Sequence, residues 1–292
     1  MLKQRIITAV LLLPLVGFLL FGIDLATFAV ALVIVAYLMA LEWGKLSGLN
    51  STTSRSFYAL VVSLIALGIW YWAPALYLWP STWFIEFHFT STLIIFWLAI
   101  VGWFVAALMI FISKSHRSFW AKNLAPRLIM GVVLILGFWV SAVALRGAGL
   151  STDPYKGGYM VLFMLTIIWG ADIGGYIFGK LFGRNKLAPT VSPGKTWEGV
   201  AGGVGLSLGV AIAGSFLLGL PIQPIYIFIP CMIALVFIAI IGDLFESLLK
   251  REVQVKDSSN LLPGHGGLLD RLDSTIAVAP FFLLTAKVLG WI

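Results

Sequence analysis

Long apolar runs are the feature that most limits what this chain can fold into. Nine of them, each of roughly 16 to 21 residues, are long enough to cross most or all of the ~30 Å hydrocarbon layer of a bilayer as a helix. They cover residues 6–21, 25–41, 57–72, 92–112, 128–145, 159–178, 200–218, 225–241 and 276–292. Hydrophobic residues make up 61% of the chain, which is typical of membrane proteins and not of soluble domains. The sequence therefore predicts an all-α polytopic integral membrane protein with about nine transmembrane helices.

Basic residues are distributed unevenly between the two sides that nine spans would create. If the N-terminus is cytoplasmic, the outer segments hold only Arg146 and Lys156. The cytoplasmic segments hold sixteen, namely Lys3, Arg5, Lys45, Arg55, Lys114, Arg117, Lys122, Arg127, Lys180, Arg184, Lys186, Lys195, Lys250, Arg251, Lys256 and Arg271. An excess of Lys and Arg marks cytoplasmic loops. We therefore expect a multi-pass protein of the cytoplasmic (inner) membrane, with its N-terminus inside. Because these charges lie in short loops between spans, no nucleic-acid partner is expected.

One segment, residues 242–274, is dense in charge although the whole chain is only 11% charged. Its charged residues are Asp243, Glu246, Lys250, Arg251, Glu252, Lys256, Asp257, Asp270, Arg271 and Asp273. Carboxylates this close to membrane spans are costly and usually functional. Carboxylates for a hard cation, together with Lys and Arg for phosphates, suit chemistry on a nucleoside triphosphate. We interpret the segment as a cytoplasmic active site; the alternative is a solvated loop with ordinary surface ion pairs.

The spacing within this segment supports a site between two helices. If the helix continues past Gly242, four side chains share one of its faces: Asp243, Ser247, Lys250 and Gln254. Asp270 and Asp273 are three apart, so they share a face at the start of the last helix. Residues 262–267, Leu-Pro-Gly-His-Gly-Gly, lie between the helices, where glycines let backbone N–H groups approach an anion.

A second unusual block covers residues 169–199. It contains glycine pairs four residues apart, which predict close helix packing: Gly170/Gly174, Gly175/Gly179, Gly199/Gly203 and Gly205/Gly209. Asp172 lies in or at the edge of an apolar run, so we expect it to face a polar cavity shared with the C-terminal site. An ion pair between Asp172 and a nearby Lys is the alternative.

Residues 194–196, Gly-Lys-Thr, have the appearance of the end of a P-loop. The leading Gly of that motif would fall on Pro189, however, and no soluble strand precedes the segment. We therefore predict that the chain has no Walker-type nucleotide fold.

Both blocks resemble the phosphatidate cytidylyltransferase (CDP-diacylglycerol synthase) family. The C-terminal block matches the signature of that family without departure from Ser247 to Asp273: Ser247, Lys250-Arg251, Lys256-Asp257, Pro263-Gly-His-Gly-Gly and Asp270-Arg-Leu-Asp273. The second block matches from Gly170-Ala-Asp172 through Ser192-Pro-Gly-Lys-Thr-Trp-Glu198. The resemblance covers most of residues 165–275, while the N-terminal half is similar only in topology.

The resemblance implies transfer of a cytidylyl group from CTP to phosphatidate, giving CDP-diacylglycerol and pyrophosphate. The candidate catalytic residues are Asp243, Lys250, Arg251, Lys256, Asp257, His265, Asp270 and Arg271. The candidate substrate-binding residues are Asp172, Ser192, Lys195, Ser247, Gly266 and Gly267. Asp243, Asp270 and Asp273 are assigned to Mg²⁺, and the family leaves room for a second cation and for a homodimer. Residues 1–150 are expected to form a scaffold, and residues 151–292 the catalytic region with its cytoplasmic loops.

Two other functions share parts of this pattern. A CTP-dependent polyprenol or phytol kinase also joins CTP and a lipid in the membrane. A transporter would also place an ionisable residue and Gly-rich helices within the bilayer, but it needs no cytoplasmic cluster of phosphate-binding cations. The full pattern from Ser247 to Asp273 favours the cytidylyltransferase.

Overall fold

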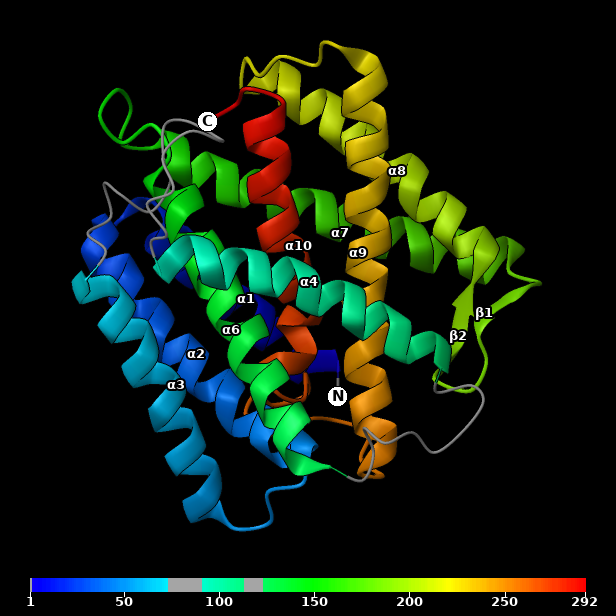
Figure 1. The fold of residues 1–292 in the computed structure, drawn as a ribbon. Helices are drawn as coiled ribbons and strands as arrows, with labels where there is room; N and C mark the ends of the chain where they lie inside the picture. Colours follow the sequence, from blue (N-terminus) through cyan, green and yellow to red (C-terminus); the bar gives the residue numbers. More distant parts are fainter. Residues whose placement is uncertain (1, 73–90, 113–122) are drawn as a thin grey trace.

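The computed structural model describes residues 2–72, 91–112 and 123–292, and within these ranges the chain is almost entirely helical (Figure 1). The elements are α1 (Leu2–Phe21), α2 (Leu25–Ser47), α3 (Thr52–Trp72), α4 (Ser91–Ile112), α6 (Leu124–Gly147), α7 (Lys156–Phe182), β1 (Lys186–Ala188), β2 (Ser192–Thr196), α8 (Trp197–Leu217), α9 (Ile225–Glu252) and α10 (Leu269–Val288). Strands β1 and β2 form one antiparallel hairpin. The predicted all-α class is confirmed.

The loops between helices lie at two opposite ends of the molecule. Residues 48–51 and 253–268 lie at the lower end in Figure 1, whereas residues 148–155, residues 218–224 and the C-terminus lie at the upper end. This alternation agrees with the two sides expected from the basic residues. The predicted cytoplasmic residues Lys114, Arg117 and Lys122 lie outside the described residues.

By length and composition, seven of the described helices can cross a membrane: α2, α3, α4, α6, α7, α8 and α9. The described side chains of α1 contribute only a shorter apolar stretch, Val10–Phe21. Helix α10 begins at Leu269, ahead of the apolar run at 276–292, so it includes charged residues at both ends. These findings show a polytopic membrane protein, in which α10 is the least apolar of the described helices.

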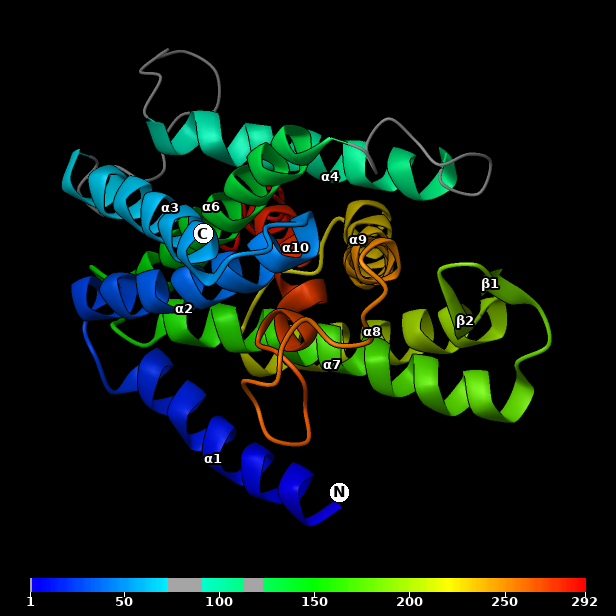
Figure 2. The same cartoon turned by 90° about the horizontal axis from the view of Figure 1, so that it is seen from below.

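Helix α10 lies at the centre of the bundle, with α9, α6 and α7 around it (Figures 1 and 2). From Ser274 to Pro280 each of its side chains is buried, and Phe282 packs against Phe163 of α7 and Trp291. Its surroundings are therefore other helices and not lipid. This explains why α10 can be less apolar than its neighbours.

Aromatic packing fixes the half of α9 that carries its charged residues against the N-terminal helices. Phe245 of α9 is buried between Trp43 of α2 and Trp103 of α4, with ring centroids 6.1 and 6.2 Å away. The indole N–H of Trp43 donates to the Arg127 carbonyl at 2.9 Å, and the Arg127 side chain pairs with Glu252 at 2.5 Å. The charged end of α9 is thus held by three other helices.

The glycines of α7 and α8 bring these two helices into backbone contact. A Cβ added at Gly174 would lie 2.4 Å from the Gly202 carbonyl oxygen, and one at Gly203 would lie 2.8 Å from the Ala171 carbonyl oxygen. The predicted close packing at these positions is confirmed. The prediction for Gly205/Gly209 is wrong, because an added Cβ at either position meets nothing within 4 Å; these two glycines face away from α7.

The close contact between α7 and α8 predicts that the effect of a Gly-to-Ala substitution on stability depends on its position. Gly174→Ala should destabilise the protein by about 1–3 kcal/mol, because the new Cβ overpacks against backbone that has no room to move. Gly205→Ala, in open space, should be neutral or stabilising by up to about 1 kcal/mol, since alanine favours helix. Thermal unfolding in detergent micelles measures both, and equal effects would contradict the described packing.

The position of α9 in the bundle predicts that its two ends lie on opposite sides of the membrane. Gln223 and Lys256 are both exposed and lie just beyond the two ends of this helix. In a Cys231→Ser background, Gln223→Cys should react with a membrane-impermeant maleimide added to intact cells. Lys256→Cys should react only after permeabilisation. Labelling of both from one side would contradict a membrane-spanning α9.

Candidate active site

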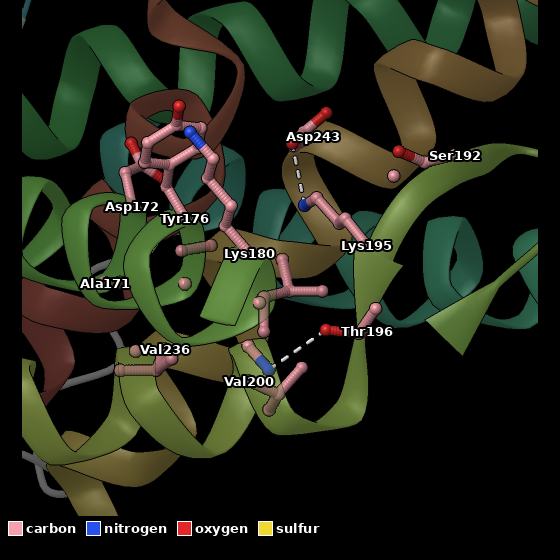
Figure 3. Close-up of a pocket in the computed structure, with 17 residues that line it drawn as sticks. Ala171, Asp172, Tyr176, Lys180, Ser192, Lys195, Thr196, Val200, Val236 and Asp243 are labelled. Carbon is pink, nitrogen blue, oxygen red and sulfur yellow. Dashed lines mark hydrogen bonds and ion pairs between the residues drawn. The ribbon is translucent and has the colours of Figure 1, made fainter. Parts of the chain in front are cut away.

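A pocket of about 520 Å³ lies between α7, α8, the β hairpin and α9 (Figure 3). Its polar wall includes Asp172 and Lys180 from α7, Ser192 and Lys195 from β2, and Asp243 from α9. Figure 3 shows Asp172, Tyr176 and Lys180 on one side of this space and the hairpin residues Ser192 and Lys195 on the other. The two sequence blocks therefore meet in one cavity, as expected for Asp172 and Asp243.

The β hairpin is fixed at its base by α8. Thr196 caps α8, and its hydroxyl accepts a hydrogen bond from the Gly199 N–H at 3.2 Å. Glu198 accepts bonds from the backbone N–H of Arg184 at 3.1 Å and from the side-chain amide of Asn185 at 2.8 Å. The strand that carries Ser192 and Lys195 thus continues directly into a capped helix, which holds both side chains at the pocket.

Lys195 and Asp243 form an ion pair across the pocket. The distance from Lys195 Nζ to Asp243 Oδ2 is 2.7 Å, and the hydroxyl of Ser247 donates to Asp243 Oδ1 at 3.3 Å. The side chains of Lys195 and Asp243 are 26% and 34% exposed, so substrate can reach them. The predicted neighbourhood of Asp243 and Ser247 on one helical face is confirmed.

Two further carboxylates, Asp172 and Asp273, lie close enough to this ion pair to interact with it, and Asp172 also interacts with Arg271. Asp172 and Asp273 both interact electrostatically with Lys195 and Asp243. Asp273 comes close because Gly242 leaves no side chain between α9 and α10: a Cβ added there would lie 2.5 Å from the Asp273 carbonyl oxygen. No ion pair of Asp172 with Lys or Arg is found among the described residues. The structure therefore supports the polar-cavity interpretation of Asp172.

The loop between α9 and α10 begins earlier than the residue spacing predicts. Helix α9 ends at Glu252, and Gln254 has a left-handed backbone with φ of 56°. The prediction that Gln254 shares the helical face of Asp243 is therefore wrong. Further along, the His265 N–H donates to the Leu262 carbonyl across a turn in which Pro263 is followed by Gly264 at φ of 76°. Pro followed by a positive-φ Gly is the pattern of a type II turn.

Lys250 lies between two carboxylates at the C-terminal end of α9. Its ammonium group is 2.6 Å from Glu246 Oε2 and 2.8 Å from Asp270 Oδ1. The side chains of Lys250, Glu246 and Asp270 are 15%, 4% and 4% exposed. Asp270 Oδ2 accepts further bonds from the Ser258 and Gly267 N–H groups at 2.9 and 2.8 Å. This cluster ties α9, the loop and α10 together.

The remaining candidate residues lie in this loop or in the helix turns next to it. Arg251 donates to the Val191 carbonyl at 3.5 Å, which connects α9 to the hairpin. Arg271 is exposed and donates from Nε to the His265 carbonyl at 3.0 Å. Lys256 and Asp257 are exposed at the surface of the loop, and Asp257 lies beside Gly266.

The model of the cytidylyltransferase family matches residues 3–289 of this chain. Phosphatidate cytidylyltransferase of Haemophilus influenzae is 38% identical over 287 residues, covering 97% of each chain. That of Pseudomonas aeruginosa is 37% identical over 293 residues, covering 100% of this chain and 99% of its own. That of Bacillus subtilis is 46% identical over 134 residues, or 45% of this chain and 49% of its own. The chain belongs to the cytidylyltransferase family. It is accordingly a nucleotidyltransferase with membrane-spanning helices.

In this cytidylyltransferase, the three predicted metal ligands do not form one group. Asp243 and Asp273 lie near the pocket, whereas both oxygens of Asp270 are engaged by Lys250, Ser258 and Gly267. Within residues 2–72, 91–112 and 123–292, no three His, Cys, Asp or Glu side chains are placed to hold a metal ion by themselves. The metal assignment is taken up below as a proposal.

The sequence did not single out three polar residues that the structure of this cytidylyltransferase brings to the loop. Glu42 of α2 and Ser258 are bonded to each other, and Glu246 pairs with Lys250. Glu246 is four residues before Lys250, so the helical period could have identified that pair. Glu42 stands three residues before Lys45, and that spacing alone suggests only a pair on one helix face.

Proposed function

We propose that this chain is a phosphatidate cytidylyltransferase, which uses CTP and phosphatidate to make CDP-diacylglycerol and pyrophosphate in phospholipid biosynthesis. The names of two relatives that match over almost their whole length support this proposal. It is also supported by the match of the family model over residues 3–289.

The structural observation that carries the proposal is the mixed lining of the pocket. One part is charged, with Asp172, Lys195 and Asp243; another is apolar, with Val236 and Ile240 of the membrane helix α9. A phospholipid with a phosphate head needs both kinds of surface. Its acyl chains can stay among the membrane helices while its phosphate meets the nucleotide at the charged end.

The reaction requires positioning more than a strong base. An ionised oxygen of the phosphatidate phosphate attacks the α-phosphorus of CTP, and the bond from that phosphorus to the bridging oxygen breaks. The electron pair of that bond leaves with pyrophosphate. Because all reactants are anions, cations that bring them together lower the barrier. Lys195, in the pocket, is the proposed cation for a substrate phosphate, with Lys256 and Arg271 at the exposed side of the loop.

The other candidate residues are proposed to form the part of the site that binds the nucleotide. Ser192 and Ser247 supply hydroxyl groups beside Lys195 and Asp243. His265, Gly266 and Gly267 shape the loop over the nucleotide, with Asp257 beside them. Arg251 holds α9 to the hairpin, and Lys250 with Asp270 holds α9 to the start of α10.

The charge around Lys195 fits a divalent cation. Asp172, Asp243 and Asp273 are three carboxylates that interact with the Lys195 ammonium group, and Arg271 interacts with Asp172, so the cluster has more carboxylates than cations and supplies hard, anionic oxygen donors. Mg²⁺ in nucleotide enzymes is usually held by one or two carboxylates together with substrate phosphates and water. Asp243 and Asp273 would hold it, with Asp172 nearby. When bound, Mg²⁺ neutralises triphosphate charge. A second cation stays a prediction.

The charge distribution between loops supports an active site that faces the cytoplasm, where CTP is present, in a cytoplasmic (inner) membrane. The pocket lies toward the end of α9 that carries residues 243–252, and this end is the predicted inner end. A homodimer, which the family resemblance implies, stays a prediction, as does the division into a scaffold at 1–150 and a catalytic region at 151–292.

Purified protein supplied with phosphatidate, Mg²⁺ and CTP labelled in either of two positions tests the function. Label in the cytosine should appear in the lipid product, and label in the γ-phosphate should appear in pyrophosphate. Transfer of the γ-label to a polyprenol or phytol would instead identify a lipid kinase. No transfer of either label to lipid would overturn the proposal and leave the transporter alternative.

A further inference from the structure

A buried carboxylate from the N-terminal half reaches the loop between α9 and α10. Glu42 of α2 is only 5% exposed. It accepts four hydrogen bonds from the far end of the chain: Ser259 Oγ at 2.6 Å, Leu269 N at 2.7 Å, Ser258 Oγ at 2.9 Å and Leu268 N at 3.0 Å. No Lys or Arg pairs with Glu42 within the described ranges. Its donors in this region of the structure are therefore hydroxyl and backbone N–H groups.

The backbone donors show what Glu42 does for α10. Leu268 and Leu269 are at the start of this helix, where N–H groups have no partner within the helix. An anion at this position also interacts favourably with the helix dipole. Helix α10 has no side-chain cap on its N-cap residue Leu268. Glu42 supplies that cap from a different helix, and thereby fixes where the loop ends and α10 begins.

Ser258 connects Glu42 to the charged cluster. Its hydroxyl lies 2.9 Å from both Glu42 Oε2 and Asp270 Oδ2, and its N–H donates to the same oxygen of Asp270 at 2.9 Å. Lys45, one helical turn after Glu42, donates to the Ser258 carbonyl at 2.8 Å. Two side chains of α2 thus hold the residue that in turn holds Asp270, the partner of Lys250.

The packing around Gly267 leaves no room for a side chain. A Cβ added at Gly267 would lie 2.0 Å from Ser258 Oγ and 2.6 Å from Glu42 Oε2. Any larger residue would separate Glu42 from the loop. The glycine before α10 is therefore required for contact with α2, in addition to any contact with substrate.

We propose that Glu42 is a positioning residue for cytidylyl transfer. From α2 it fixes the loop at 256–268 and the first turn of α10, so that Asp270, Lys250 and the His265-Gly266-Gly267 segment are aligned for the nucleotide. This inference rests on the proposed function, because it assigns the loop to the CTP side of the site. It gives the N-terminal half a part in aligning the site, in addition to its role as a scaffold.

Glu42→Gln tests the proposal, since it keeps the size of the side chain but puts an amide against donors. We expect kcat/KM for CTP to fall about 10- to 100-fold, as for other residues that orient a site from behind it, with KM for phosphatidate unchanged. Backbone hydrogen exchange at Leu268 and Leu269 should become about tenfold faster, because their acceptor is weakened. A role in folding alone would reduce the amount of folded protein and leave KM for CTP unchanged.

Asp24→Asn is the matched control. Asp24 is also a helix-capping carboxylate, accepting from Thr27 N at 2.8 Å, but it lies in the turn before α2, at the opposite end of this helix from Glu42. This variant should keep wild-type KM for CTP. If Glu42→Gln does not fold, Ser258→Ala takes its place, because it removes the hydroxyl that bridges Glu42 and Asp270 while the backbone N–H of residue 258 keeps its bond to Asp270. It should raise KM for CTP more than Ser259→Ala does.

The outcomes separate this inference from the proposed function. Slower transfer without faster exchange at Leu268–Leu269, or faster exchange with unchanged KM for CTP, would overturn the positioning role of Glu42. Absence of cytosine-labelled lipid with the wild-type protein would overturn the proposed function instead.

Discussion

Replacing Asp243 with Asn should lower turnover at least about 100-fold, equivalent to roughly 3 kcal/mol of transition-state stabilisation, while the protein stays folded. Asp243 contributes a carboxylate to the pocket and pairs with Lys195 at 2.7 Å. Asn keeps the shape but removes the charge that a Mg²⁺ ligand needs. Because both partners are about a quarter to a third exposed, loss of the ion pair itself should cost no more than about 1 kcal/mol of stability.

Turnover measured against Mg²⁺ concentration, beside a thermal melt, separates the possible roles of Asp243. A metal-ligand role predicts that Asp243→Asn needs more Mg²⁺ than the wild-type protein and that chelation with EDTA stops the wild-type reaction. Asp153→Asn is the control: Asp153 is exposed in the loop before α7, and its side chain accepts from the Tyr155 N–H. Near-normal turnover of Asp243→Asn at ordinary Mg²⁺ would show that this carboxylate is not a ligand.

The helices were predictable because membrane helices follow a single strong rule. Each apolar run corresponds to one helix, and the turn at Gly22-Ile23-Asp24 separates α1 from α2 with Asp24 as the cap. The rule fails where a helix is surrounded by protein. Helix α10 is buried by other helices, so its polar first turns are tolerated, and its start at Leu269 could not be found from hydropathy.

The meeting of the two sequence blocks was also predictable. Asp172 within an apolar run is costly unless it faces a polar space, and the pocket provides that space together with Lys195 and Asp243. The spacing of the charged residues in the sequence, however, did not indicate which side chains form ion pairs. Lys250 lies on the same continuous helix as Asp243 at the expected spacing, but that spacing did not indicate that its ammonium group contacts Glu246 and Asp270.

The least predictable feature is the contact between the two halves of the chain. Glu42 and Ser258 are separated by more than two hundred residues, and nothing in either local sequence points to the other. The glycine pairs also show that local spacing does not decide which residues make tertiary contacts. Gly199/Gly203 and Gly205/Gly209 have the same spacing, but only the first pair faces α7. Periodicity defines helical faces, whereas tertiary packing decides which face is used.

Lys250→Met should destabilise the protein by about 3–5 kcal/mol, the usual consequence of leaving a buried charge without its partner. The ammonium group of Lys250 is the ion-pair partner of both Glu246 and Asp270, whose side chains are each 4% exposed. Met fills a similar volume, so the loss reports the charge and not a cavity. Thermal or denaturant unfolding in micelles measures it. Lys156→Met, on the predicted outer side, should change stability by no more than about 0.5 kcal/mol.

A second substitution shows whether the cause is electrostatic. In Lys250→Met combined with Glu246→Gln, one of the two unpaired carboxylates is gone, so the double variant should be more stable than Lys250→Met alone. Additive losses would instead indicate that Lys250 acts through packing. Turnover per folded molecule then distinguishes two roles for this residue. If Lys250 only holds α9 to α10, the double variant should recover activity along with stability. If its ammonium group also meets a phosphate of CTP, stability should return without turnover, and the residue would belong among the cations that bind substrate.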